Sequence, residues 1–177
     1  MGYSLFLESE FFHFFNWHEQ DPCDDCALPV AKIFKPGAYE EHIDLEIHLN
    51  TDREITQAEL ALTREWVGSQ DTLNLFAKDI IKSFIAFFTE AEDSPNGKDL
   101  VDSIWNLQGS KNLANALERA KKPPYLPNPE IDQALKAVLG KEEIAEIEFK
   151  HSSIQFNNVF RDGASYLLIL WRERRKG

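Results

Sequence analysis

Residues 42–49, with the sequence HIDLEIHL, decide the fold. Every second position of this stretch carries an aliphatic side chain: Ile43, Leu45, Ile47 and Leu49. Because successive side chains of a strand point to opposite faces, this alternation predicts a β-strand with one buried and one solvated face. Residues 30–35 predict a second strand, and the turn signal Pro36-Gly37 lies between the two. We therefore expect the two strands to pair, as a hairpin or at least as neighbours.

Residues 71–91 follow a different period. Their apolar side chains recur at spacings of three and four: Leu73, Phe76, Ala77, Ile80, Ile81, Phe84, Ile85 and Phe88. This spacing predicts an amphipathic helix with a single buried stripe. At ~1.5 Å per residue the helix is about 30 Å long, which is the diameter of a small domain. We therefore expect it to be the central helix, packed against the sheet.

The C-terminal region returns to strand patterns. Residues 164–171 are apolar at nearly every position, as in a strand that is covered on both sides. The dipeptide Asp162-Gly163 before them is a strong hairpin signal. The apolar positions of residues 147–149 and 154–160 are out of phase, which predicts a β-bulge or break near Ser152.

The N-terminal segments give weaker patterns. Residues 3–7 predict a short strand, and Ser9 is the predicted N-cap of a short aromatic helix over residues 11–17. Residues 55–67 fit a helix face and a strand alike, so both interpretations stay open.

Further helices are predicted near residues 100–105 and 110–120, and another starts at Pro129. The order of strands, then helices, then strands indicates an α+β fold. We expect an antiparallel sheet, made of an N-terminal hairpin and a C-terminal hairpin, with four to five helices inserted between them. A length of 177 residues fits a single globular domain over residues 1–177.

The charge of the chain is unevenly distributed. Its 30 acidic and 19 basic residues give a net charge of -11, and residues 1–60 hold 13 acidic and three basic residues. Such a surface repels phosphate groups, so we expect no nucleic-acid partner and no anionic membrane, whereas a basic protein is favoured. The apolar run 166–171 is too short to cross a bilayer, and the first residues lack the basic segment of a signal peptide. We expect a soluble, cytoplasmic protein.

Eight carboxylates in this first third could form one negative field: Glu19, Asp21, Asp24, Asp25, Glu40, Glu41, Asp44 and Glu46. Asp44 and Glu46 share the solvated strand face, and Glu40 and Glu41 lie just before that strand. If the loop before the hairpin folds back beside it, we expect no lysine or arginine among these groups. The pattern predicts a partner-binding surface at Glu40, Glu41, Asp44 and Glu46, and the alternative explanation is solubility alone.

Cys23 and Cys26 are the only cysteines, and the two aspartates between them would raise a thiol pKa, which argues against a redox dithiol. Two thiolates at this spacing are half of a tetrahedral zinc site, which His18 or His13 could complete. The chain has no second cysteine pair to close such a site. We expect two free thiols without a disulfide and no bound metal, with zinc on Cys23, Cys26 and His18 as the alternative.

A second candidate site is the polar face of the first strand: His42, Asp44, Glu46 and His48. Alternate residues of a strand are about 6.6 Å apart, so His42 and His48 are about 20 Å apart and one metal ion cannot bind all four side chains. Adjacent pairs could serve as metal ligands or as an acid and a base. The solvated face of an antiparallel sheet explains the same pattern without chemistry.

The sequence contains no phosphate-binding glycine loop, nucleophile elbow, dinucleotide fingerprint, zinc-protease motif or EF-hand loop. We therefore expect a non-catalytic protein-binding module that uses its acidic N-terminal surface. The alternative is a metal-binding protein or metal-dependent enzyme that uses the Cys23/Cys26 loop and the His42–His48 strand face. The residues leave the oligomeric state open.

Overall fold

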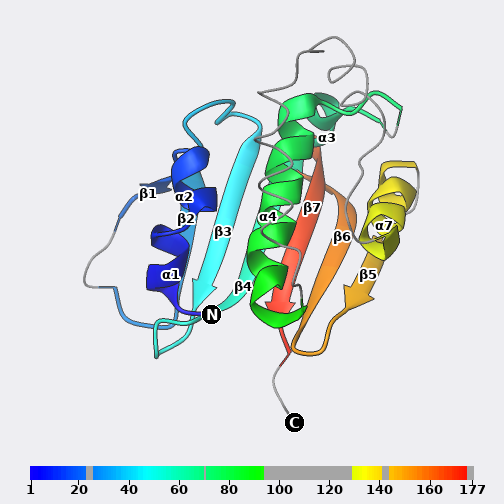
Figure 1. Ribbon diagram of the computed structural model, residues 1–177. Coiled ribbons are helices and arrows are strands. Elements are labelled where there is room, and N and C mark those ends of the chain that lie inside the picture. Colours follow the sequence, from blue (N-terminus) through cyan, green and yellow to red (C-terminus); the bar gives the residue numbers. More distant parts are fainter. Residues whose placement is uncertain (23–25, 70, 94–128, 141–143, 175–177) are drawn as a thin grey trace, which may run out of the picture.

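The computed structural model describes residues 1–22, 26–69, 71–93, 129–140 and 144–174. They form a seven-stranded antiparallel sheet with the strand order β1-β2-β3-β4-β7-β6-β5 (Figure 1). The strands are β1 (His18–Gln20), β2 (Val30–Lys35), β3 (Ile43–Leu49), β4 (Ile55–Thr63), β5 (Ile144–Glu148), β6 (Ser152–Arg161) and β7 (Ala164–Glu173). The described helices are α1 (Tyr3–Leu7), α2 (Glu10–Phe14), α3 (Arg64–Val67), α4 (Leu75–Asp93) and α7 (Pro129–Gly140). The sheet is antiparallel and helices are inserted between β4 and β5, so the fold is α+β, as predicted.

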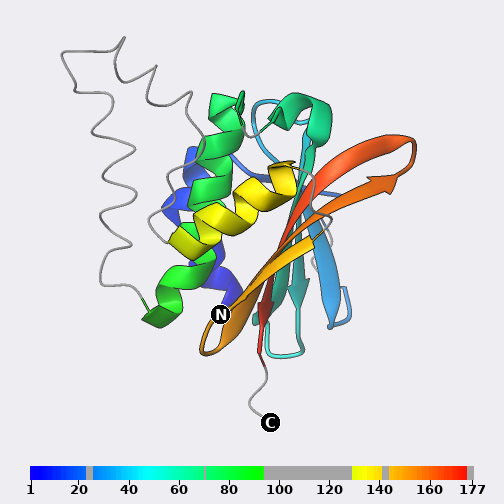
Figure 2. The same cartoon turned by 90° about the vertical axis from the view of Figure 1, so that its right-hand side faces the viewer.

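The sheet has one covered side and one open side. Helices α1, α2, α4 and α7 lie on the same side, and within the described ranges no helix lies on the other (Figure 2). We call this second side the open face. Cross-strand pairing places on it the following side chains of β2, β3, β4 and β7: Ile33, Lys35, Asp44, Glu46, His48, Gln57, Glu59, Ala61, Leu168, Leu170 and Arg172.

The predicted pairing of β2 with β3 is confirmed. The two strands are antiparallel, with Phe34 opposite Leu45. The four aliphatic side chains of β3 are at most 3% exposed and point to the covered side. The polar residues between them are half-buried and lie on the open face. The alternation in the sequence therefore gives both the strand and the direction in which each side chain points.

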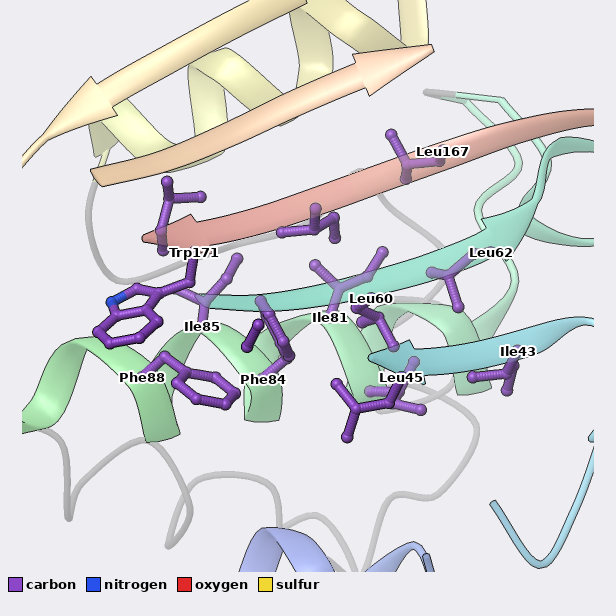
Figure 3. Packing of buried hydrophobic residues seen from close by; sticks show 14 of the residues in the cluster. Ile43, Leu45, Leu60, Leu62, Ile81, Phe84, Ile85, Phe88, Leu167 and Trp171 are labelled. Carbon is purple, nitrogen blue, oxygen red and sulfur yellow. The ribbon is translucent and has the colours of Figure 1, made fainter. Parts of the chain in front are cut away.

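Helix α4 is the central helix of the covered side. Ile80, Phe84 and Phe88 are fully buried, each 0% exposed. Figure 3 shows Phe84 and Phe88 on the side of α4 that faces β4 and β7, with Phe88 beside Trp171. The packing of a single apolar stripe on the sheet is the arrangement that the sequence predicts.

The helix begins at Leu75 and not at residue 71, because Asn74 caps it. The side-chain Oδ1 of Asn74 accepts the backbone N–H groups of Phe76 and Ala77, at 2.9 and 3.1 Å. Asparagine is one of the strongest N-cap residues, since its short side chain satisfies the amide groups that the first turn leaves without a partner.

Residues 3–7 form helix α1, so the predicted strand is wrong there. This five-residue segment is too short for its own pattern to separate helix from strand. Phe6 is fully buried and packs edge-on against Phe12 and Phe34, with ring centroids 5.2 and 5.5 Å apart. This tertiary packing decides the local structure. Helix α2 begins as predicted, since the Ser9 hydroxyl accepts the Phe12 backbone N–H at 3.1 Å.

The ambiguous segment 55–67 contains a strand and then a short helix. Strand β4 ends at Thr63, and helix α3 starts at Arg64. β4 is extended because it pairs with β3 on one edge and β7 on the other, so its backbone hydrogen bonds are made on both sides. Gly68 ends α3 with a φ of +88°, and a Cβ atom at this position would lie 2.3 Å from the Thr72 carbonyl oxygen.

Two predictions near the C-terminus are confirmed. Asp162 and Gly163 close the β6–β7 hairpin with φ angles of 53° and 82°, both positive as a type I′ turn requires. Helix α7 begins at Pro129, a residue favoured at the first helical position. The helices expected at residues 100–105 and 110–120 lie outside the described residues, so the number of inserted helices stays a prediction.

Of the bulge or break predicted near Ser152, the structure has the break and not the bulge. The two runs belong to different strands, β5 and β6, which pair antiparallel. A tight turn joins them, in which the backbone N–H of Phe149 donates to the carbonyl oxygen of Ser152 at 2.8 Å. The apolar phase changes because the chain reverses direction and not because one strand contains an extra residue.

The burial of Phe84 gives the first testable prediction. Phe84→Ala leaves a cavity between α4 and the sheet, and we expect it to lower the free energy of unfolding by about 3–5 kcal/mol. Urea unfolding followed by circular dichroism measures this change. The matched control is Phe160→Ala, because Phe160 is 75% exposed and its loss should change the free energy by no more than about 0.5 kcal/mol. Equal effects of the two substitutions would contradict the central position of α4.

Asp79 on α4 gives a pH-dependent prediction. Burial raises the pKa of Asp79, and the nearby Lys82 and Lys78 only partly oppose this. The folded protein therefore holds this proton more tightly than the unfolded chain does, and the stability from this group is lost as the pH rises through the folded pKa. We expect Asp79→Asn to unfold at a higher urea concentration than the unsubstituted chain at pH 7, with a smaller difference at pH 4.

Asp71→Asn is the control for this measurement, because Asp71 is exposed just before the same helix. Its unfolding midpoint should match that of the unsubstituted chain at both pH values. A destabilised Asp79→Asn variant at pH 7 would show that the carboxylate is held by favourable interactions instead.

Candidate functional site

The four acidic residues predicted to bind a partner lie at one end of the β2–β3 hairpin. Glu40 and Glu41 lie in the turn before β3, with side chains 66% and 65% exposed. Asp44 and Glu46 follow on the open face, at 42% and 37% exposure. We call these four residues the acidic surface. Their exposure leaves each carboxylate accessible to a second molecule.

The structure places a lysine next to this group, which corrects the expectation that it contains no base. Lys35 of β2 lies beside β3, and its Nζ is 2.7 Å from the Asp44 carboxylate. The same ammonium group donates to the backbone carbonyl oxygen of Glu40 at 2.9 Å. Residues far apart in sequence meet through strand pairing, so the spacing of charges along the chain does not reveal this contact.

The eight carboxylates also do not form one field. Glu19 of β1 is paired with Phe34, whose side chain points to the covered side, so Glu19 and Asp44 lie on opposite sides of the sheet. Lys32 neutralises Glu19 at 2.5 Å. Asp24 and Asp25 lie outside the described residues.

A fifth carboxylate lies next to the acidic surface on the open face, with only 19% of its side chain exposed. Glu59 of β4 is directly opposite Glu46 of β3. Like charges at such positions repel each other. Each has a cationic or titratable neighbour, since Glu46 lies 2.6 Å from His48 and Glu59 lies 3.3 Å from Arg161. The sequence pattern missed Glu59 because the strand interpretation of its segment was still open.

The histidines of the β3 face have separate neighbours. His42 Nδ1 lies 2.9 Å from the Thr63 hydroxyl, and its ring stacks on Trp66 at 5.5 Å between centroids. His48 contacts Glu46 on the next position of the same face. Among the described residues, no group of three or more His, Cys, Asp or Glu side chains could hold a metal ion.

The second predicted metal site is partly described. Cys26 is disulfide-bonded, which contradicts the expected free thiol at this position. Two cysteines with two residues between them can oxidise to a disulfide or stay reduced, and the sequence does not distinguish the two states. His18 lies on β1 with 49% of its side chain exposed, 3.8 Å from Glu40. Zinc needs thiolates, so the zinc alternative on Cys23, Cys26 and His18 concerns only the reduced chain.

His18 and Cys26 both line a cavity of about 660 Å³ between α1 and the β1–β2 edge of the sheet. Tyr3 and Lys32 line it as well, and the Lys32 ammonium lies 5.8 Å from the centre of the Tyr3 ring. Burial, together with the Glu19 carboxylate, raises the pKa of Tyr3 to about 12. Sequence reasoning missed this cavity, because its walls come together only when the N-terminal helix folds onto the sheet edge.

Comparison with models of protein families, with curated proteins and with solved structures finds no match to this chain. None of the described helices is long and apolar enough to span a membrane.

The redox state of Cys26 is directly testable. Alkylation of the native protein without reductant should leave Cys26 unlabelled in peptide mass spectrometry, and labelling should appear after treatment with dithiothreitol. Labelling without reductant would show that the thiol is free. Zinc titration of the reduced chain then tests the metal alternative, which requires one equivalent to bind and His18→Ala to weaken that binding.

Proposed function

We propose that this protein is a non-catalytic binding module that holds a basic protein partner on its acidic surface. The observation that carries this proposal is the exposure of Glu40, Glu41, Asp44 and Glu46, whose side chains are 37–66% exposed at one end of the open face. The excess of acidic residues in the first 60 positions supports the same choice of partner.

The pairing of Lys35 with Asp44 does not block this function. Both side chains are partly exposed, at 24% and 42%. An ion pair at such a position contributes roughly 0–1 kcal/mol to stability, so a cation of the partner can replace Lys35 at little cost. The displaced ammonium group still has the Glu40 carbonyl oxygen as an acceptor.

Apolar side chains on the open face support contact with a protein over contact with a small cation. Ile33 lies directly opposite Glu46 and is 45% exposed. Leu168, which is half-buried, lies on the same face, two strands away from β3. Protein interfaces combine apolar contact with a polar rim, and this face offers both.

The partner and its salt dependence test the proposal. A pull-down from the native host should recover a basic protein at low salt and release it at high salt. Dissolved ions screen the attraction between exposed charges, beyond about 8–10 Å at physiological ionic strength and over shorter distances as the salt concentration rises. With that partner purified, the variant Glu40→Gln/Glu41→Gln/Asp44→Asn/Glu46→Gln should lower the association rate more than it raises the dissociation rate.

The matched control removes four exposed acids outside the acidic surface: Glu8→Gln, Asp52→Asn, Glu54→Gln and Glu173→Gln. It changes the net charge by the same amount, so a similar loss of association rate in both variants would assign the effect to total charge. A neutral or acidic partner with salt-insensitive binding would overturn the proposal.

A further inference from the structure

Three aromatic side chains from distant parts of the chain meet beside the acidic surface. Tyr39 lies in the β2–β3 turn, Trp66 in α3 and Phe76 in the first turn of α4, all at the same end of the sheet (Figure 1). The Tyr39 ring is 5.4 Å from that of Trp66 and 5.0 Å from that of Phe76, and the last two are 6.1 Å apart. We call these three residues the aromatic cluster.

The aromatic cluster is open to solvent at Tyr39. This residue is 48% exposed, whereas Trp66 and Phe76 are half-buried. The sequence predicted that Phe76 belongs to the fully buried stripe of α4, and the structure places it at the margin of the core instead. One face of Trp66 is stacked by His42 at an interplanar angle of 11°. The Tyr39 ring is therefore the accessible platform of the cluster.

The backbone of Tyr39 is strained. Its φ is +58°, a conformation that asparagine, aspartate and glycine adopt more readily than an aromatic residue. The turn is held in place by the backbone N–H of His42, which donates to the Tyr39 carbonyl oxygen at 2.9 Å. A strained aromatic residue that stays half-exposed gains little from burial, and such residues gather at binding sites.

Acidic residues are the neighbours of the aromatic cluster along the chain. Glu40 and Glu41 follow Tyr39 directly, and Glu65 precedes Trp66 and is exposed. Glu41 lies 3.4 Å from the His42 ring that stacks on Trp66. An aromatic face beside carboxylates attracts a cation in two ways: through the negative electrostatic potential of the ring face and through the negative charge of the carboxylates.

We propose that the aromatic cluster, together with Glu40 and Glu41, binds an arginine side chain of the basic partner. This inference rests on the proposed function and names the group that is recognised. A guanidinium group is planar, is only weakly hydrated and has five N–H donors. It can stack on the Tyr39 ring while it donates one or two hydrogen bonds to a neighbouring carboxylate. A lysine ammonium is a compact and strongly hydrated charge, so it gains less from the ring.

The experiment compares three peptides with the same glycine spacing, which carry four arginines, four lysines or four citrullines. Citrulline has the shape of arginine without its charge. Each peptide is titrated into the ¹⁵N-labelled full chain, and the Trp66 indole N–H and the residue 39 amide report binding at the cluster. We expect the arginine peptide to bind about two- to five-fold more tightly than the lysine peptide, and the citrulline peptide not to bind.

Tyr39→Asn tests the role of the ring, because asparagine tolerates a positive φ and so preserves the turn. We expect it to lower the affinity for the arginine peptide more than that for the lysine peptide, so that the two affinities become similar. Phe160→Ala, which removes an exposed aromatic ring elsewhere, is the matched control and should alter neither affinity. Glu40→Gln/Glu41→Gln should weaken both cationic peptides.

The outcomes separate the two proposals. If neither cationic peptide binds the unsubstituted chain, the basic-partner function fails and the arginine site fails with it. If both bind equally and Tyr39→Asn changes nothing, the acidic surface stands and the role of the aromatic cluster is overturned. Binding of the citrulline peptide with similar affinity would also overturn it, since the cluster would then select apolar shape and not charge.

Discussion

The structure depends on the packing of α4 against the β3–β4–β7 part of the sheet. Without this helix, the aliphatic face of the three central strands would be in water, and burial of that face is the main favourable contribution to folding. The same contact determines which side of the sheet stays open. Because the four apolar side chains of β3 point to the covered side, its three polar ones must point the other way, which places Asp44 and Glu46 of the acidic surface on the open face.

Local signals in the sequence were sufficient for much of the fold. The alternation in residues 42–49, the stripe of α4 and the Asp162-Gly163 turn depend only on neighbours along the chain, and the structure has all three. Residues 3–7 differ because Phe6 packs against Phe34 of β2, a residue distant in sequence. The phase shift near Ser152 leaves a bulge and a break both open, because it looks the same whether one strand bulges or the chain reverses direction.

The site was predictable to a smaller extent. Exposure of Asp44 and Glu46 follows from the strand period, and the structure agrees. The contact of Lys35 with Asp44, and the opposition of Glu46 and Glu59, need the register between strands, which no single segment specifies. The approach of Tyr39 to Trp66 needs the position of a short helix as well, so it becomes visible only in three dimensions.

The seam between β4 and β7 has a consequence for how the chain reaches this fold. Arg172 of β7 donates a hydrogen bond to Gln57 of β4 across a sequence separation of 115 residues. The β2–β3 and β6–β7 hairpins can form early from local contacts. The pairing of β4 with β7 requires closure of a loop of more than one hundred residues, which slows folding. During synthesis on a ribosome, β4 emerges long before β7 and has an unpaired edge in the meantime. Such an edge can pair with other chains, so the β4 edge exposes a nascent chain to misassembly until β7 is made.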